Sequence, residues 1–354
     1  MQTTLNSNPA ERLAEKPQLG GGWTVVSKVP RLPGATGGNF SVGYVVENGR
    51  GRQAFLKALD YSHAFKQPNP TEVINILTSS YVYEKSLLNQ CRDRRLSRVN
   101  VSIDDGEVPA GELHETLTVP YIIFELADGD VRQRLDQTDG FDLAFVLRAL
   151  HHSAVGIRQL HDAKVAHQDL KPSNVLDFRD DGCRVADLGR SSSQDGNSPH
   201  DNLVIAGDTT YAPPELLYGH ISPDWRVRRF ACDLYQIGSL AVFFFTQVGI
   251  TALWHEYLDR TFLPDNWGEG YASVLPHVRQ AHDLAFEEFE EQLPDEIRGI
   301  LGPAVRQLCD PDPGRRGHPR NLSQRVNRYS VQRYISIFDR IARIAEWRLR
   351  KTMT

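Results

Sequence analysis

The spacing of apolar and polar positions changes along the chain, from short strand-like runs to longer helical ones. Three early runs are rich in β-branched and aromatic residues: WTVVSKV from Trp23, FSVGYVV from Phe40 and QAFLKALD from Gln53. The last two flank the Gly-rich turn ENGRGR and therefore predict an antiparallel hairpin. NPTEVINILTSSYVYEKSLLNQC then has helical periodicity, and RVNVSIDDGEV and TVPYIIFELADG return to strand character. The first third of the chain thus predicts a β-rich lobe with one long helix.

From about Phe141 onward the pattern is mainly helical, beginning with the amphipathic run DLAFVLRALHHSAVGIRQLHDA. The most apolar run, IGSLAVFFFTQVGITALW, is interrupted by Gly, Thr and Gln, which favours a buried core helix over a membrane span. The C-terminal run SVQRYISIFDRIARIAEWRLRK has an Arg-rich face opposite an apolar one. We expect an extra helix packed on the second part of the chain, with a dimer contact or a membrane-surface helix as the alternatives. The apolar face comprises Val331, Tyr334, Ile335, Phe338, Ile341, Ala345 and Leu349.

Composition narrows the class of protein. With 354 residues the chain is long enough for two packed lobes. Its net charge of −5 provides no basic field, so nucleic acid is not expected as a partner. The four cysteines lie far apart without metal-binding spacing, which predicts reduced thiols and a cytoplasmic location. The polar start MQTTLNSNPAERLAEKPQLGGG has no apolar core of a signal peptide and predicts a flexible arm over residues 1–22.

Candidate chemistry concentrates in VAHQDLKPSNVL, residues 165–176. Asp169 can take the proton of a nucleophile, Asn174 can bind a metal ion, and Lys171 can neutralise a phosphoryl group in transit. Phosphoryl transfer requires little beyond in-line positioning, a divalent cation and positive charge around the phosphoryl oxygens. Further on, Asp187 in RVADLGRSS follows the predicted hairpin turn DFRDDGCRV and supplies a second carboxylate for a metal ion.

Taken in order, these motifs resemble the eukaryotic-type protein kinase family, most nearly its bacterial eukaryotic-like members, over roughly residues 23–320. HQDLKPSN resembles the catalytic loop, DLG the metal-binding motif usually written DFG, and GDTTYAPPE the end of an activation segment. CDLYQIGSL resembles the start of the buried helix that anchors the large lobe. In DPDPGRRG, Arg316 takes the place of the residue that pairs with Glu215.

The resemblance implies an α+β, two-lobed protein-kinase-like fold. The small lobe would be β-rich with one long helix and cover residues 23–126. The large lobe would be mainly helical and cover residues 127–320, followed by a helical extension over residues 321–354. The implied partners are ATP and a protein with a Ser or Thr acceptor, without an integral membrane segment.

The resemblance also implies an ATP site that uses Mg²⁺, with Mn²⁺ as the alternative ion. Lys57 in AFLKALD would contact the α- and β-phosphates and pair with Glu84, whose position on an apolar helix face itself requires a cationic partner. The implied catalytic residues are Asp169, Lys171 and Asn174, and the metal ligands are Asn174 and Asp187. The Gly-rich loop GATGGNFSVGYVV carries Thr36 where the first Gly is usual. The implied nucleotide-binding residues are Gly37, Gly38, Phe40, Ser41, Gly43, Phe55, Lys57, Glu84, Phe124, Glu125, Ala127, Leu176 and Asp187.

The position of Lys171, two residues after Asp169, implies a serine/threonine-directed kinase. Two alternatives are a small-molecule phosphotransferase and a pseudokinase that only binds nucleotide. The Pro-Pro-Glu segment and its Arg partner favour a peptide-binding platform over the first alternative. Lys57, Glu84, Asp169, Asn174 and Asp187 are all present, so the sequence gives no chemical reason to prefer the pseudokinase alternative.

Four further positions depart from the family pattern. Gln168 replaces an Arg that binds a phosphorylated activation loop, so we expect activity without that phosphorylation. Asp208 stands where a Thr is usual. Phe55 and Gly43 stand where Ala and Val are usual above the adenine ring. We expect these two changes to compensate, with the Phe55 ring filling the space above Gly43.

Overall fold

The computed structural model describes residues 8–15, 18–30, 40–109, 118–137, 140–324 and 327–353. The chain divides into two compact units, Met1–Arg95 with Asn100–Asp128, and Leu96–Val99 with Gly129–Thr354. The first unit carries a five-stranded antiparallel sheet and the second is mainly helical, which confirms the predicted α+β kinase-like fold class.

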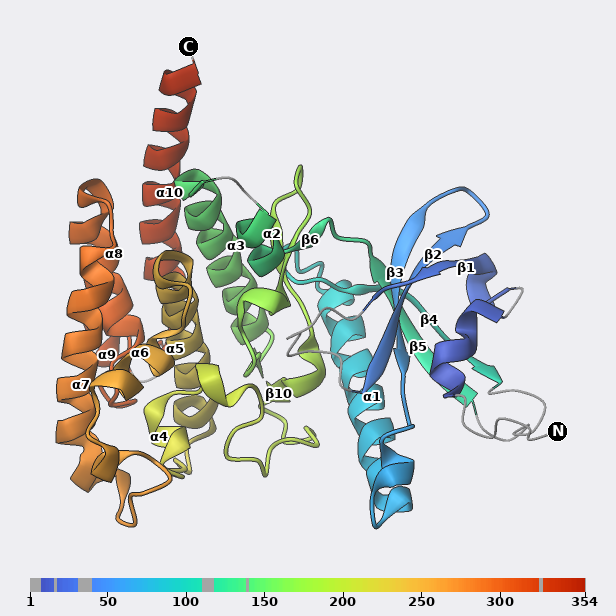
Figure 1. Cartoon of the computed structure of the whole chain (residues 1–354), viewed down its shortest axis with the longest axis horizontal. Helices are drawn as coiled ribbons and strands as arrows, with labels where there is room; N and C mark the ends of the chain where they lie inside the picture. The colour runs from blue at the N-terminus through green and yellow to red at the C-terminus, as the bar shows by residue number, and fades with distance from the viewer. Residues whose placement is uncertain are drawn as a thin grey trace. The chain divides into compact units, whose positions relative to one another are not determined.

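The sheet of the first unit has the strand order β1-β2-β3-β5-β4. The predicted hairpin joins β2 and β3, with Val46 opposite Ala54, and Gly51 in the turn has a φ of 76°, which suits glycine. Helix α1 (Pro70–Asp93) runs beside the sheet (Figure 1), and the hydroxyl of Tyr81 donates to the carbonyl of Tyr121 at 3.2 Å. The strands are β1 (Trp23–Lys28), β2 (Ser41–Asn48), β3 (Gln53–Leu59), β4 (Ser102–Pro109) and β5 (Thr118–Glu125).

The described residues before β1 differ from the flexible arm that we expected over residues 1–22. A 3-10 helix, η1 (Pro9–Glu15), packs on the sheet, where Ala10 and Leu13 are each 1% exposed and belong to its apolar core. The hydroxyl of Tyr44 on β2 donates to the carbonyl of Ala10 at 2.7 Å. Burial of these two apolar side chains outweighs the polar composition of the segment.

Helix α5 (Trp225–Thr246) forms the centre of the second unit. Its apolar run is buried, with Ile237, Leu240 and Phe244 at most 1% exposed, as the sequence predicts for a core helix. It ends at Gln247, which has a left-handed φ of 64°. No single helix in the described part of the chain is long and apolar enough to cross a membrane. Helices α5 and α6 (Ile250–Tyr257) reach that length and apolar content only when taken together, and they meet at a bend of 78°.

Short strands in the second unit position the loops that carry the candidate chemistry. β7 pairs with β10, and a second small sheet has the order β6-β8-β9. The loop 167–174 lies between β7 and β8, and Asp187 follows β9. The strands are β6 (Gly129–Asp130), β7 (Val165–Ala166), β8 (Val175–Asp177), β9 (Cys183–Val185) and β10 (Ser192–Ser193). The other helices are α2 (Val131–Gln137), α3 (Leu143–Asp162), α4 (Pro214–Leu217), α6 (Ile250–Tyr257), α7 (Tyr271–Glu291), α8 (Asp295–Leu308), α9 (Pro319–Leu322) and α10 (Gln332–Met353).

Helix α10, drawn red, runs alongside α3 (Figure 1). Arg148 on α3 links the two helices, because its guanidinium donates to Asp339 at 2.9 Å and to Glu346 at 2.7 and 2.9 Å. The predicted apolar face is buried from Val331 to Ala345. It does not extend to Leu349, which is 44% exposed, because the last turns of α10 continue beyond the buried part of the face.

The predicted pair of Glu215 and Arg316 joins the end of the activation segment to the segment after α8. The Arg316 guanidinium donates from Nη1 and Nη2 to the two Glu215 oxygens, both at 2.7 Å, and both residues are buried. Its Nε donates to the carbonyl of Asp310 at 2.9 Å. This bidentate geometry offsets much of the cost of burying the two charges.

We expect Arg316→Met to lower the free energy of unfolding by about 3–5 kcal/mol, because it leaves the Glu215 carboxylate buried without its partner. The measurement is urea denaturation, with Arg315→Met as the control, since the neighbouring side chain is 66% exposed. Equal losses from the two substitutions would show that the buried pair contributes nothing specific.

Candidate active site

The loop 167–174 is held on α5 by one buried carboxylate. Asp233 is fully buried, and its Oδ2 and Oδ1 accept the backbone N–H groups of His167 and Gln168, both at 2.8 Å. His161 on α3 contacts the same carboxylate through Nε2 at 2.8 Å. Gln236, one turn further along α5, accepts from the N–H of Leu170 at 3.0 Å and donates to the carbonyl of Gln168 at 2.9 Å. The helix therefore fixes the backbone on both sides of Asp169.

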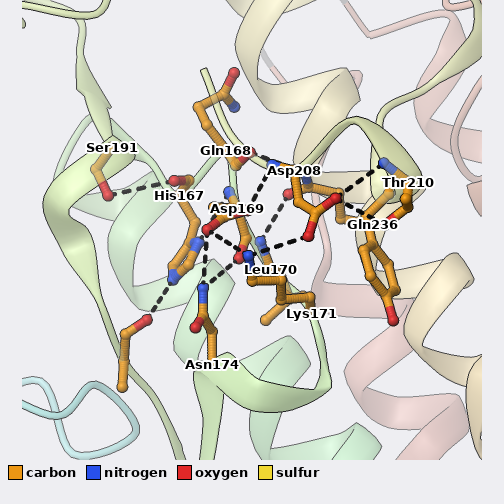
Figure 2. A network of polar contacts seen from close by, with 12 residues as sticks. His167, Gln168, Asp169, Leu170, Lys171, Asn174, Ser191, Asp208, Thr210 and Gln236 are labelled. Atoms are coloured by element: carbon orange, nitrogen blue, oxygen red, sulfur yellow. Dashed lines mark hydrogen bonds and ion pairs between the residues drawn. The ribbon is translucent and has the colours of Figure 1, made fainter. Parts of the chain in front are cut away.

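Asp169 is buried among donors that converge on its carboxylate (Figure 2). Oδ1 accepts the N–H of Asp208 at 2.8 Å, and Oδ2 lies 3.1 Å from the amide nitrogen of Asn174 and 3.2 Å from Lys171 Nζ. Burial raises the pKa of Asp169, while the charge of Lys171 and the N–H of Asp208 offset part of that rise. The residue is thus a carboxylate in a low-dielectric site with a raised affinity for a proton.

Lys171 lies between two carboxylates, those of Asp169 and Asp208, and is only 4% exposed (Figure 2). Its Nζ is 3.3 Å from Asp208 Oδ2. Burial acts to raise the pKa of Asp208, but hydrogen bonds from Thr210 and the charge of Lys171 hold it below its ordinary value. Asp208 thus joins the activation segment to the catalytic loop through a charged contact, in the place where the family pattern has a neutral Thr.

Gly207 permits this close approach of the two loops. A Cβ atom there would come within 2.3 Å of the Gln168 carbonyl oxygen and 2.7 Å of Asp169 Oδ1. No side chain fits in that space, so only glycine lets the N–H of Asp208 reach the Asp169 carboxylate.

Asn174 and Asp187 are the residues that can hold a metal ion. The amide nitrogen of Asn174 donates to the carbonyl of Asp169 at 2.7 Å and to its Oδ2 at 3.1 Å, which directs the amide oxygen the other way. The N–H of Ala186 donates to the carbonyl of Asn174 at 2.9 Å and so places Asp187 beside it. Asp187 has a left-handed φ of 62°, a conformation that costs free energy in a non-glycine residue.

The donor chemistry of these two side chains fits Mg²⁺, which binds one or two protein oxygens and completes its octahedron with waters and phosphate oxygens. Within the described residues, no three His, Cys, Asp or Glu side chains gather as an all-protein metal site.

His167 is fully buried and fixes the geometry between these groups. Its Nδ1 accepts the N–H of Asp169 at 3.2 Å, and its Nε2 lies 3.0 Å from the carbonyl of Ala186. The imidazole ring thus joins the loop 167–174 to the turn at Asp187 through its two ring nitrogens.

In the first unit, Lys57 and Glu84 form the ion pair that the sequence predicts. Lys57 Nζ lies 2.9 and 3.1 Å from the two Glu84 oxygens, and Glu84 on α1 is 6% exposed. The register places Lys57 opposite Gly43 on β2 and Ile122 on β5. The pair therefore ties α1 to the middle of the sheet.

The predicted packing of Phe55 over Gly43 is confirmed. Ring atoms Cε2 and Cζ of Phe55 lie 2.9 and 3.1 Å from the position that a Cβ on Gly43 would occupy. The neighbouring strand places Phe124 opposite Phe55. The ring therefore fills the volume that a larger residue at position 43 would need.

The remaining predicted nucleotide-binding residues lie in three places. Phe40 packs edge-on against His63 with ring centroids 5.5 Å apart, and Ser41 begins β2. Glu125 ends β5 and Ala127 follows it, both partly buried, whereas Leu176 lies on β8 in the second unit. Thr36, Gly37 and Gly38 lie outside the described residues.

From the sequence we did not identify the residues of α5 that hold the loop 167–174 in place: Arg229, Asp233 and Gln236. The sequence does carry a signal, because spacings of four and three place these residues on one helix face, and Asp233 and Gln236 interrupt an apolar run.

A cavity of about 370 Å³ in the second unit lies beside the activation-segment end. Thr210, Tyr211, Phe243 and Arg132 contribute to its walls. The guanidinium of Arg132 on α2 lies 5.6 Å from the centre of the Phe243 ring and donates to the Tyr211 hydroxyl at 3.3 Å. The cavity is large enough for a side chain and presents both apolar and cationic surface.

Comparison with known proteins agrees with this geometry. A family model described as a protein kinase domain matches residues 37–256, well over half of the chain. The chain belongs to the protein kinase family. A probable cell division protein kinase of Encephalitozoon cuniculi is 27% identical over 177 residues, which cover 49% of this chain and 50% of that protein.

Other relatives differ in the specificity that their names state. The serine/threonine-protein kinase PknB of Mycolicibacterium smegmatis is 26% identical over 38% of this chain and 21% of its own length. The membrane-associated tyrosine- and threonine-specific cdc2-inhibitory kinase of Drosophila melanogaster is 30% identical over 46% of this chain and 24% of its own length. The matched parts thus span half or less of these relatives.

Gly43→Val is expected to lower the free energy of unfolding by about 1–3 kcal/mol, because the new side chain overlaps the Phe55 ring. In a Phe55→Ala background the same change should cost about 0.5–3 kcal/mol less, because the two positions are coupled. Denaturant unfolding of the four proteins measures this, and strict additivity would refute the compensation. Gly49→Val is the control, since a Cβ there meets nothing within 4 Å.

Asp169→Asn is expected to raise the thermal unfolding midpoint near neutral pH, because it removes a buried negative charge. The folded-state pKa of Asp169 is raised, so the carboxylate lowers stability as the pH rises through the interval between its unfolded and folded values. The gain should be full above that interval and should vanish below the ordinary value of about 3.9. Melting curves over this range test the sign, and a variant less stable than the native protein at neutral pH would contradict it.

Proposed function

We propose that the chain is an ATP-dependent serine/threonine protein kinase that transfers the γ-phosphate of ATP to a protein hydroxyl. The observation that carries the proposal is the cluster of three buried residues, Asp169, Lys171 and Asn174, with the partly buried Asp208, in which the Lys171 ammonium lies between two carboxylates. Such a set costs free energy to bury, and phosphoryl transfer is the chemistry that uses it.

In this mechanism the hydroxyl oxygen of the substrate attacks the γ-phosphorus and the bond to the bridging β–γ oxygen breaks, releasing ADP. Asp169 orients the hydroxyl and accepts its proton, a role that its raised proton affinity supports. Lys171 balances negative charge on the transferring phosphoryl group.

The ATP phosphates require further cationic partners. Lys57, held by Glu84, would bind the α- and β-phosphates. Asn174 and Asp187 would hold Mg²⁺, or Mn²⁺ in its place, which neutralises the charge of the phosphates when it is bound. Residues 23–126 would thus serve nucleotide binding, residues 127–320 catalysis and substrate binding, and residues 321–354 form an added helical part.

Three features support a peptide hydroxyl over a small molecule. Lys171 follows Asp169 by two residues, as the resemblance implies for serine/threonine-directed members. The buried pair of Glu215 and Arg316 secures the segment end. The cavity beside Thr210 offers room for a neighbouring side chain of a peptide.

All four cysteines are buried free thiols, which supports a cytoplasmic location.

Asp169→Asn is expected to reduce phosphoryl transfer by about 10²–10⁴-fold while ATP binding persists, because only the proton acceptor is lost. The measurement is transfer of labelled phosphate from ATP to a serine/threonine peptide mixture, together with calorimetric ATP binding. The exposed Asp180→Asn serves as the control. Near-native turnover of Asp169→Asn would remove Asp169 from this role.

Asp187→Asn should instead abolish the Mg²⁺-dependent part of nucleotide binding, since it removes a carboxylate ligand. Thermal shifts with ATP in the presence and absence of Mg²⁺ measure this directly. An unchanged Mg²⁺-dependent shift would exclude Asp187 as a metal ligand.

A further inference from the structure

Arg229 on α5 is fully buried and is bound almost entirely by neutral groups. Its Nη1 donates to Oε1 of Gln168 at 3.1 Å. Its Nη2 lies 3.4, 3.0 and 3.3 Å from the carbonyl oxygens of His200, Asp201 and Leu203. One guanidinium therefore contacts both the catalytic loop and the middle of the activation segment.

A fully buried guanidinium is normally paired with a carboxylate, because its desolvation is costly. Here no carboxylate oxygen lies within ion-pair distance of Arg229 among the described residues, and burial lowers the pKa of Arg229. Stability alone does not account for a cation in this place. The planar guanidinium of Arg229 does fit a role in which one side chain binds two segments of the chain at once.

Gln168 complements Arg229 closely. Its amide nitrogen donates to the carbonyl of Arg229 at 2.9 Å and to Asp233 Oδ1 at 3.0 Å, while its oxygen accepts from Arg229. All the polar atoms of this buried side chain are thus satisfied. A second guanidinium at position 168 would face Arg229 at close range and repel it.

The activation segment is folded onto α5 around this contact. Ser192 on β10 donates to Asp201, and the indole N–H of Trp225 donates to Ser192 Oγ at 3.0 Å. From Leu203 only a short stretch of chain leads to Asp208, whose N–H binds the Asp169 carboxylate. The position of the segment 200–203 therefore determines whether Asp208 reaches the catalytic loop.

We propose that Arg229 is a positioning residue that holds the activation segment in its working arrangement through backbone carbonyls, in place of a phosphate group on that segment. The inference rests on the proposed function and concerns the regulation of the same site. Because the acceptors are part of the chain, the contact is complete as soon as the chain folds. Ser192, which is 1% exposed, already uses its hydroxyl within this arrangement, so a phosphate there would disrupt it.

The test compares Arg229→Met, Arg229→Lys and Gln168→Met with the native enzyme, all treated with phosphatase and checked by mass spectrometry. Arg228→Met is the matched control, since it removes a cation from the adjacent position on the same helix, where Nη1 makes a long 3.5 Å hydrogen bond to the Ser222 carbonyl. Two readouts are taken: kcat/KM for peptide and for ATP, and hydrogen exchange of the amides of Asp201, Leu203 and Asp208.

The phosphate-free native enzyme should keep its rate within about twofold. Arg229→Met should lower kcat/KM for the peptide by about tenfold to a hundredfold, because several hydrogen bonds from a charged donor are lost. Its effect on the KM for ATP should be under about threefold. The three amides should exchange at least about tenfold faster, with α5 unchanged. Arg229→Lys and Gln168→Met should give smaller losses in the same direction.

Unchanged peptide kcat/KM and unchanged exchange in Arg229→Met would overturn the proposal, as would loss of most native activity on phosphatase treatment. If Arg229→Met does not fold, Gln168→Met and Arg229→Lys decide by the same readouts. Should the native enzyme transfer no phosphate at all, the proposed function fails, whereas the exchange readout still tests whether Arg229 holds the segment.

Discussion

The buried carboxylate of Asp233 is the contact on which the rest of the candidate site depends. It accepts the N–H groups of His167 and Gln168 and so fixes the backbone that precedes Asp169. Asp233 lies on α5, which is buried in the apolar core. The close packing of that core therefore restricts the movement of the loop 167–174. An anionic anchor makes stronger hydrogen bonds than a neutral one and permits little adjustment of the loop.

The same helix supplies the second half of the arrangement. One turn before Asp233, Arg229 reaches the activation segment, and one turn after it, Gln236 reaches the far side of the loop. Three polar residues on one helix face thus position the groups of the candidate site. The site gives up stability for this, since Asp169 is buried with a raised pKa and Asp187 has a left-handed backbone.

The sequence predicted a contact correctly where the chemistry of two short stretches of chain is enough to specify it. The place of Glu84 on an apolar helix face predicted a cationic partner, and the resemblance to protein kinases identified it as Lys57. Comparison with the family pattern also showed the volume mismatch that predicted the packing of Phe55 on Gly43. The change in apolar periodicity predicted a β-rich part followed by a mainly helical part, and the resemblance to protein kinases implied the α+β fold class. These contacts could be predicted because few other partners would satisfy the buried charge or fill the gap.

The sequence did not predict features whose structure depends on how the whole core packs. The packing of η1 depends on apolar side chains of the sheet that are distant in sequence, so the local pattern of residues 9–15 does not predict it. Leu349 continues the apolar stripe of α10 by its spacing, but its side chain is 44% exposed. The role of Arg229 depends on how residues 200–203 fold, and a polar, Ser-rich segment has no periodicity from which to infer that path.

We expect the loop 167–174 to be assembled on α5 before any nucleotide, peptide or phosphate binds. Native-state hydrogen exchange of the His167 and Gln168 amides in the unliganded, unphosphorylated enzyme tests this most directly, because both amides donate to Asp233. We predict that they exchange only through global unfolding, at the same slow rate as the amides in the middle of α5. Exchange that is orders of magnitude faster, and that slows only when ATP and Mg²⁺ are added, would contradict the account.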